Sequence, residues 1–234
     1  MIDLALLDTC AAQAGVSLKQ EQLLQFDRYA ALLCEWNQKM NLTAITEPDE
    51  IVHKHFADCL HALAFLPQTP GISLIDVGTG AGFPGIAWLI ARPDLQLTLL
   101  DSLQKRITFL QAVLAELDLK AKTVHARAED AGRDAALREQ FDCAAARAVA
   151  PMNVLCEYCL PFVRPGGVFV SLKGKTDEAP EAENAVSLLG GKIEKNVSFD
   201  LEGAGTRRVV LVRKISQTPT AYPRKPAKIT KAPL

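Results

Sequence analysis

The spacing of hydrophobic residues along the chain changes after Leu66. Before that point, apolar residues such as Leu23, Phe26, Leu33 and Trp36 recur every three or four positions, which is the spacing of one face of a helix. This pattern predicts helices over residues 3–14 and 18–40, and a third helix that begins at 46–49 and runs to 63. We therefore expect a helical N-terminal cap over residues 1–66.

After the cap, short apolar runs alternate with amphipathic segments. Strands are expected over residues 72–77, 97–101, 122–125, 141–147, 167–173, 192–199 and 207–215, and helices over 84–91, 103–117, 153–163 and 178–189. Strands separated by helices form a parallel sheet that is covered on both faces. The last two strands have no helix between them, which predicts an antiparallel hairpin at the edge of the sheet. The expected fold is α/β, with a mostly parallel seven-stranded sheet over residues 67–216.

Charge is distributed unevenly along the chain. The 26 basic and 27 acidic residues give a net charge of −1, but the last 18 residues carry four cations and no acid. The same segment, residues 217–234, contains four prolines. We expect an extended or disordered basic tail without a core residue, and an anionic partner such as nucleic acid.

Several classes of protein are disfavoured by the sequence. An apolar run of about 18 residues is missing, and Asp3 and Asp8 stand where a signal peptide needs positive charge, so we expect a cytoplasmic protein with no membrane contact. Cys156 and Cys159 form a C-x-x-C pair, which is compatible with a metal or redox site or with two packed thiols. Without a second pair at ligand spacing, we expect neither a metal site nor disulfides.

A glycine-rich segment follows the first expected strand and opens a helix. It reads Asp76-Val-Gly-Thr-Gly-Ala-Gly-Phe-Pro-Gly85, and Asp101 ends the next strand 25 residues after Asp76. Glycines let the backbone approach a ligand where a Cβ atom would clash, and a helix start presents free N–H groups. A carboxylate at Asp101 can accept hydrogen bonds from ribose hydroxyls. The sequence thus predicts a nucleoside-binding site at the carboxyl edge of the sheet.

Two cofactors are compatible with this segment. The stretch from Gly80 to Gly85 satisfies G-x-G-x-x-G, which favours a dinucleotide and hydride transfer. The longer string, with Asp76 two residues before G-x-G-x-G, favours S-adenosylmethionine, because an acid beside the loop attracts the ammonium group of that ligand. The terminal hairpin also favours a methyltransferase sheet. The alternatives are a nicotinamide-dependent oxidoreductase, an RNA-binding module that borrows the fold, and a purely structural turn.

Shorter motifs add a family resemblance over nearly the whole chain. Together with the glycine-rich segment they are Asn41-Leu-Thr-Ala-Ile, His55-Phe-Ala-Asp58, Arg147-Ala-Val-Ala-Pro, Leu172-Lys-Gly-Lys and Tyr222-Pro-Arg-Lys. In this order they resemble the bacterial small-subunit ribosomal RNA methyltransferase G family, also called glucose-inhibited division protein B. Cys59 stands where Ser is expected and Met152 where Leu is usual, and neither lies in the cofactor motifs.

The resemblance implies a Rossmann-like class I methyltransferase fold that uses S-adenosylmethionine to methylate N7 of a guanosine in 16S ribosomal RNA. Gly78 and Gly80 would face the methionine part of the cofactor, Phe83 would contact it and Asp101 would bind the ribose. The implied sites for the adenine end are Ala128 and Glu129. Arg147 ends an otherwise apolar strand, which fits a contact with the cofactor carboxylate or with RNA better than packing.

No catalytic acid or base is expected, because N7 of guanine carries an in-plane lone pair and loses no proton on methylation. The expected partner is 16S ribosomal RNA or the small ribosomal subunit, bound by a monomer. The candidate RNA-binding residues are Lys173, Lys175, Arg207, Arg208, Arg224 and Lys225. A substrate role of Asn41 or His55 rests on the resemblance alone.

Overall fold

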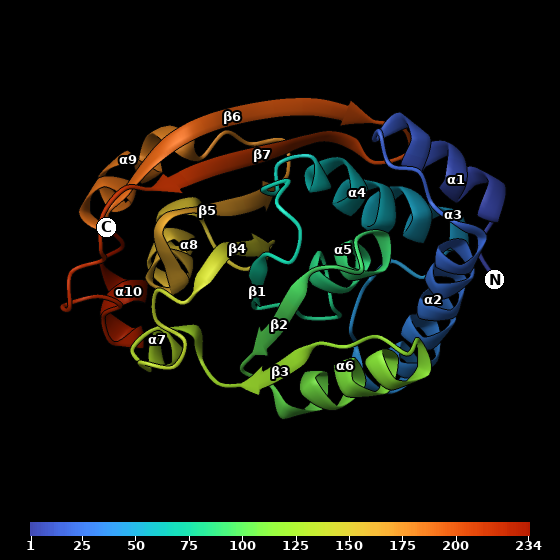
Figure 1. The fold of residues 1–234 in the computed structure, drawn as a ribbon, viewed down its shortest axis with the longest axis horizontal. Helices are drawn as coiled ribbons and strands as arrows, with labels where there is room; N and C mark the ends of the chain where they lie inside the picture. Colours follow the sequence, from blue (N-terminus) through green and yellow to red (C-terminus); the bar gives the residue numbers. More distant parts are fainter.

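The computed structural model describes residues 1–234 and confirms the expected α/β fold (Figure 1). The cap consists of α1 (Leu4–Gln13), α2 (Gln20–Met40) and a third helical stretch. That stretch is divided into α3 (Pro48–Ile51), a π-helical segment (Val52–Ala57) and α4 (Asp58–Leu63). The sequence pattern predicted one helix here and gave no sign of the π-helical turn, a feature that often lies at functional sites.

The sheet has the strand order β3-β2-β1-β4-β5-β7-β6. Its parallel part consists of β1 (Ser73–Val77), β2 (Gln96–Asp101), β3 (Lys122–His125), β4 (Phe141–Arg147) and β5 (Val163–Lys173). The expected terminal hairpin is formed by β6 (Gly191–Leu201) and β7 (Gly205–Lys214), and β7 pairs antiparallel with both β5 and β6. The chain order changes direction at β1, so loops diverge there and leave room for a ligand.

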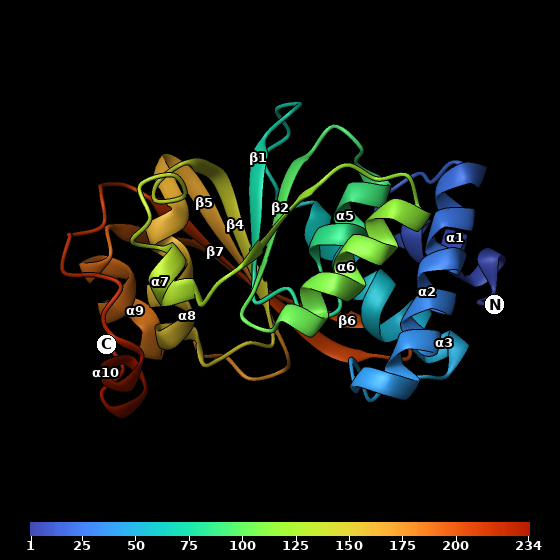
Figure 2. The same ribbon diagram turned by 90° about the horizontal axis from the view of Figure 1, so that it is seen from below.

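Helices cover both faces of the sheet (Figure 2). One layer contains α5 (Gly85–Ala91), α6 (Gln104–Glu116) and the cap helices, which share one hydrophobic core with that face of the sheet. The other layer contains α7 (Ala128–Ala131), α8 (Met152–Cys159) and α9 (Ala179–Leu188), and most of its buried residues form a second core. The cap is therefore packed as part of the main body. A membrane-spanning helix is not found among the helices of the structure.

The tail differs from the expectation of an extended or disordered segment. Residues Pro226–Lys231 form α10, with Pro226 in the first turn, and Ile229 within it is fully buried. Thr218 and Pro223 are also buried. The prediction of a tail without core residues was wrong because a few apolar residues scattered among cations and prolines give too weak a periodic signal to predict packing.

A buried ammonium group anchors the start of the tail. Lys214 ends β7 with no exposed surface, and its Nζ donates to the carbonyls of Leu160 and Val163 at 2.7 and 3.0 Å. The same nitrogen donates to Thr218 Oγ1 at 2.7 Å and lies 3.2 Å from a carboxylate oxygen of Glu139. Burial lowers the pKa of Lys214 to about 8, and Glu139 opposes that shift. An isolated buried charge is costly, so these contacts are what make the position tolerable.

We expect Ile229→Ala to lower the free energy of unfolding by about 2–5 kcal/mol, because it removes a buried side chain and leaves a cavity. The measurement is denaturant unfolding of the full chain. Thr230→Ala, at an exposed neighbour in the same helix, is the matched control and should change stability by less than about 1 kcal/mol. Equal stability of Ile229→Ala and the parent protein would show that the tail is not packed.

Candidate cofactor and substrate site

A cavity of about 530 Å³ opens where β1, β2 and β4 end. Its lining includes every residue that the sequence predicted for the cofactor: Gly78, Gly80, Phe83, Asp101, Ala128, Glu129 and Arg147. These residues come from four separate segments of the chain, and the parallel sheet brings them to one edge. The volume is ordinary for a small-molecule pocket.

The glycine-rich loop is fixed by the neighbouring strand β2. The backbone N–H groups of Gly78 and Thr79 both donate to the Leu100 carbonyl, at 2.8 and 3.1 Å. Gly78 and Gly80 have φ of +69° and +61°, a left-handed conformation that glycine adopts without strain. A Cβ atom at Gly80 would meet no neighbour closer than 3.9 Å, so the backbone faces open space there.

Asp76 lies beneath the loop and does not line the cavity. Its Oδ2 accepts hydrogen bonds from Thr79 Oγ1 at 2.7 Å and from the Gly85 N–H at 2.9 Å, while Oδ1 is buried without a partner. Burial raises its pKa to about 6. Asp76 was expected to attract the cofactor's ammonium group. In the structure it instead stabilises the turn between β1 and α5 through its hydrogen bonds to Thr79 and Gly85.

Asp101 does line the cavity, and three donors already approach its carboxylate. Oδ1 accepts from the Leu103 N–H at 2.9 Å, and Oδ2 accepts from the Gly80 N–H at 3.0 Å and from Arg106 at 3.2 Å. The contact with Arg106 is an ion pair. A carboxylate has about four acceptor positions, so one remains.

Phe83 packs in the core and lines the cavity at the same time. It is 5% exposed, and its ring stacks on His55 with centroids 4.5 Å apart. The guanidinium of Arg147 lies over the ring, 4.7 Å from its centroid. Tyr29 packs on Phe83 as well and donates its hydroxyl to the Ala81 carbonyl at 2.5 Å, so helix α2 supports the loop.

Arg147 joins the sheet to the cap. Its Nη1 lies 3.2 Å from Asp58 Oδ2, and Arg207 approaches the other oxygen of Asp58 at 3.6 Å. The Nη2 atom of Arg147 is 3.1 Å from His55 Nδ1. Since arginine only donates, Nδ1 accepts and the proton is on Nε2, 3.0 Å from Thr43 Oγ1. Burial, followed by Arg147, lowers the pKa of His55 to about 3, so the imidazole is neutral at physiological pH.

A second hollow of about 480 Å³ adjoins the first and shares His55, Arg147 and Ala148 with it. Asp58 and Arg207 also line it. Two arginines face the one carboxylate of Asp58, so this cluster carries a net positive charge even if Asp58 is ionised. Burial raises the pKa of Asp58, and the charges of Arg147 and Arg207 oppose that shift.

Sequence reasoning missed part of the cavity wall. Tyr158 on α8 lines the side that carries Ala128 and Glu129, and Leu42 and Thr43 reach the cavity from the cap. Asn41 itself is outside the lining and ends α2 in a left-handed conformation, with φ of 50°, which turns the following residues toward the site. The quoted motif contains Leu42 and Thr43, so the resemblance located the segment correctly but not the lining residues.

The six candidate RNA-binding residues differ in how far their charges are engaged. Lys173 pairs with Glu178, Arg207 with Asp58, Arg208 with Asp177 and Arg224 with Glu157. Lys175 and Lys225 are exposed and form no ion pair. All six cysteines are free, and Cys156 and Cys159 are buried side by side in α8.

The fold is shared with methyltransferases of low sequence identity. A methyltransferase from Bacillus halodurans, described as putative, aligns at a TM-score of 0.56 with 11% identity, covering 68% of this chain and 100% of that one. Geranyl diphosphate methyltransferase in complex with S-adenosylmethionine aligns at a TM-score of 0.54 with 12% identity, covering 68% of this chain and 79% of that one. At these identities the likeness concerns the fold alone.

Sequence relatives are much closer. The ribosomal RNA small subunit methyltransferase G of Acetivibrio thermocellus is 50% identical over 227 residues, which are 96% of this chain and 93% of that protein. The protein of the same description from Brevibacillus brevis is 48% identical over 231 residues, 97% of each chain. The family model for rRNA small subunit methyltransferase G matches residues 22–209, from the second cap helix into the terminal strand. With that match and relatives of nearly the same length, the chain belongs to the rRNA small subunit methyltransferase G family.

Proposed function

We propose that the protein transfers a methyl group from S-adenosylmethionine to N7 of a guanosine in 16S ribosomal RNA. The proposal rests on the observation that two hollows share the lining residues His55, Arg147 and Ala148. One hollow lies beside the glycine-rich loop, and the other contains the positive cluster. Membership of the family supports RNA methylation over hydride transfer or a binding module. A cytoplasmic location follows from a ribosomal substrate.

The residues of the first hollow suit S-adenosylmethionine. The open space beside Gly80 would admit the methionine part, and the remaining acceptor position of Asp101 suits a ribose hydroxyl. Glu129, 6% exposed and paired only at 3.8 Å with Arg127, is an acceptor on the wall proposed for adenine. The cofactor supplies a methyl group that its sulfonium has already activated.

We propose that the guanosine enters through the second hollow. The positive cluster of Arg147, Arg207 and Asp58 suits an RNA phosphate or the electron-rich edge of guanine. Neutral His55 lines both hollows and stacks on Phe83, which lines the first. N7 needs no deprotonation, so the chain has only to align the two reactants and exclude water.

Mass mapping of 16S RNA after incubation with the enzyme and labelled S-adenosylmethionine tests this function. Small subunits and protein-free RNA are compared as substrates, and N7-methylguanosine is identified by chemical cleavage at the modified base. We expect one labelled guanosine. A label on another atom, or on no 16S residue in either substrate, would refute the assignment.

We expect Gly80→Ala to weaken S-adenosylmethionine binding about tenfold or more, because its Cβ enters the space beside the loop. Isothermal titration calorimetry measures the affinity. Gly15→Ala is the matched control, since Gly15 has φ of +72° with no neighbour within 4 Å of a Cβ and lies outside the cavity lining. Both variants should lose about 1–2 kcal/mol of stability through left-handed strain. Equal affinities in the two variants would contradict the role of Gly80.

We expect Asp101→Ala to weaken binding about ten- to a hundredfold, since hydrogen bonds to a charged group contribute about 1.5–3 kcal/mol. Lys105→Met removes a charge from the first turn of α6 without changing Asp101, and this variant should bind S-adenosylmethionine like the parent. Titration of both variants separates a specific contact from a general change of potential. An Asp101→Ala affinity within twofold of the parent would rule out the ribose contact.

The two exposed lysines should contribute to RNA capture. Each phosphate contact with single-stranded RNA adds about 0.7 to the slope of log affinity against log salt. We expect Lys175→Gln combined with Lys225→Gln to weaken RNA binding and to reduce the slope by about 1.4. Arg164→Gln, whose charge pairs with Asp142 beyond the cavity lining, serves as the control. An unchanged slope in the double variant would leave these lysines without a role in binding.

A further inference from the structure

The C-terminal segment packs against the side of the cofactor cavity that the resemblance assigns to adenine. A Cβ atom on Gly132 would lie 3.2 Å from Pro223 Cγ, so the tail and the end of α7 are in close contact. The same α7 begins at Ala128 and carries Glu129, both in the lining. The wall is therefore backed by residues that are far later in the chain.

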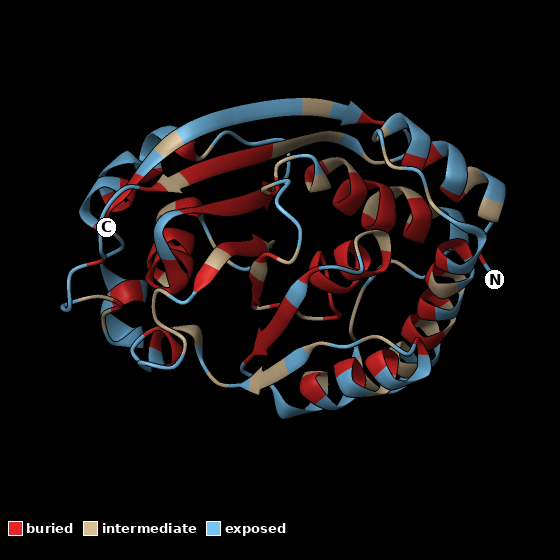
Figure 3. Ribbon diagram, in the orientation of Figure 1, coloured by how far each residue is buried: buried red, intermediate tan, exposed pale blue.

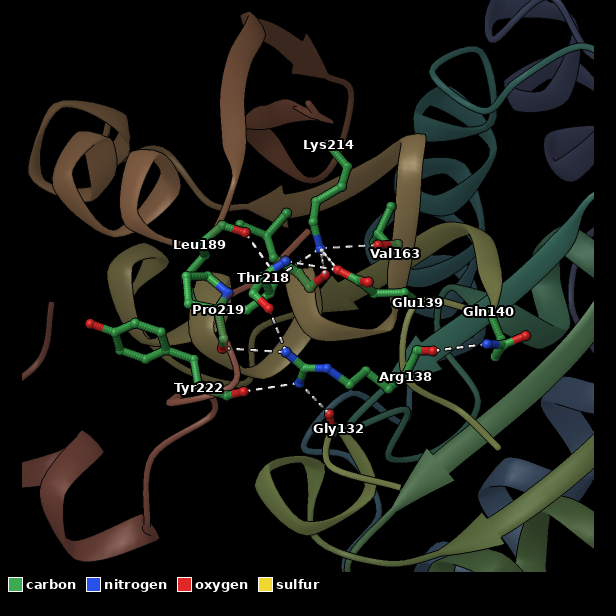
Figure 4. A network of polar contacts seen from close by, with 11 residues as sticks. Gly132, Arg138, Glu139, Gln140, Val163, Leu189, Lys214, Thr218, Pro219 and Tyr222 are labelled. Atoms are coloured by element: carbon green, nitrogen blue, oxygen red, sulfur yellow. Dashed lines mark hydrogen bonds and ion pairs between the residues drawn. The ribbon is translucent and has the colours of Figure 1, made fainter. Parts of the chain in front are cut away.

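Arg138 is the main link between this wall and the tail (Figure 4). Its Nη1 donates to the carbonyls of Gly132 and Tyr222, each at 2.9 Å. Its Nη2 donates to the carbonyls of Thr218 and Pro219, at 2.7 and 3.3 Å. Gly132 is the C-cap of α7, so a single guanidinium holds one end of that short helix and three tail carbonyls. A lysine cannot reproduce this planar fork of donors.

A second link joins the tail to α8. Glu157 is 1% exposed, and its carboxylate accepts from Arg224 Nε at 2.9 Å, from Nη2 at 2.6 Å and from the Arg224 backbone N–H at 2.7 Å. The next residue, Tyr158, lines the cavity. The side-chain hydrogen bonds of Glu157 raise the pKa of Arg224, as expected for a tight charge-assisted pair.

The tail thus spans the two elements that carry this wall. Arg138 fixes it to the end of α7, where Arg133 also donates to the carbonyls of Thr220 and Ala221, and Arg224 fixes it to α8. The start of the tail is held as well, because Thr218 accepts a hydrogen bond from Lys214 and its N–H donates to Glu139 at 2.8 Å. Glu139 directly follows Arg138 in the sequence, so neighbouring residues make both contacts with the tail.

We propose that residues 217–234 position the cofactor cavity, with Arg138 as the positioning residue through which the tail acts. The inference rests on the proposed function in one respect, since the ligand is S-adenosylmethionine. It reverses the expectation that the tail serves RNA capture alone. Charges of Lys225, Lys228 and Lys231 remain on the surface for RNA, while the backbone carbonyls and Arg224 face the body of the protein.

The test compares Arg138→Met, Arg138→Lys and Arg213→Met in the full chain. Arg213 also donates through its guanidinium to a carboxylate and a carbonyl, those of Glu194 and Gly166, but it lies outside the cavity lining. Affinity for S-adenosylmethionine is measured by calorimetry. Amide hydrogen exchange of residues 126–132 is measured in the ligand-free proteins, with residues 78–82 of the glycine-rich loop as the internal reference.

We expect Arg138→Met to weaken cofactor binding about tenfold and to accelerate exchange in residues 126–132 without changing residues 78–82. Arg138→Lys should recover part of both losses, and Arg213→Met should match the parent. A folded Arg138→Met protein with parental affinity and exchange would overturn the inference. If Arg138→Met does not fold, the same comparison is made with Arg138→Lys, whose parental behaviour would overturn it equally.

The two proposals fail in different ways. A parent protein that does not bind S-adenosylmethionine would refute the proposed function. Hydrogen exchange in the ligand-free proteins would still decide whether Arg138 holds the wall, because that measurement needs no cofactor. Faster exchange at residues 126–132 would support the coupling, and unchanged exchange would refute it.

Discussion

The carboxylate of Asp76 sets the shape of the site through two hydrogen bonds, to Thr79 and to the Gly85 N–H. These bonds close the turn between β1 and α5 and bring the glycine-rich loop to the mouth of the sheet. A Cβ atom on Gly85 would lie 2.8 Å from the same oxygen, so the turn leaves no room for a larger residue. A buried carboxylate is costly, as its raised pKa reflects, and the loop geometry depends on keeping its donors in place.

Much of the fold followed from local patterns. The boundaries of β3 and β4 were predicted to the residue, and the change from helical to alternating spacing located the cap and the sheet. The residues predicted for the cofactor line one cavity because they end or follow strands, and the ends of parallel strands gather at one edge of the sheet. The short helices α7 and α10 escaped prediction, since four and six residues give too little periodicity to recognise.

The charged partners could not be predicted for a related reason. Arg147 is 89 positions from Asp58 and 92 positions from His55, so only the fold shows that the three form one cluster. The same holds for Arg224 and Glu157, which are 67 positions apart. A basic residue in a sequence shows its charge but not whether that charge is already neutralised. For this reason the sequence marked all six basic residues equally as candidates for RNA binding, although only two of them are exposed and without an ion pair.

The strand order has a consequence for synthesis of the chain. Because β7 lies between β5 and β6, the edge of β5 has no partner until β7 has left the ribosome, and β6 cannot join the sheet before then. Strand β6 then becomes the outer edge, where most of its residues are exposed (Figure 3). Its charged residues Lys192, Glu194 and Lys195 suit that position, since charges discourage pairing between copies. A nascent chain ending before residue 205 would leave that edge of β5 unpaired, and unpaired strand edges of partly folded chains favour aggregation.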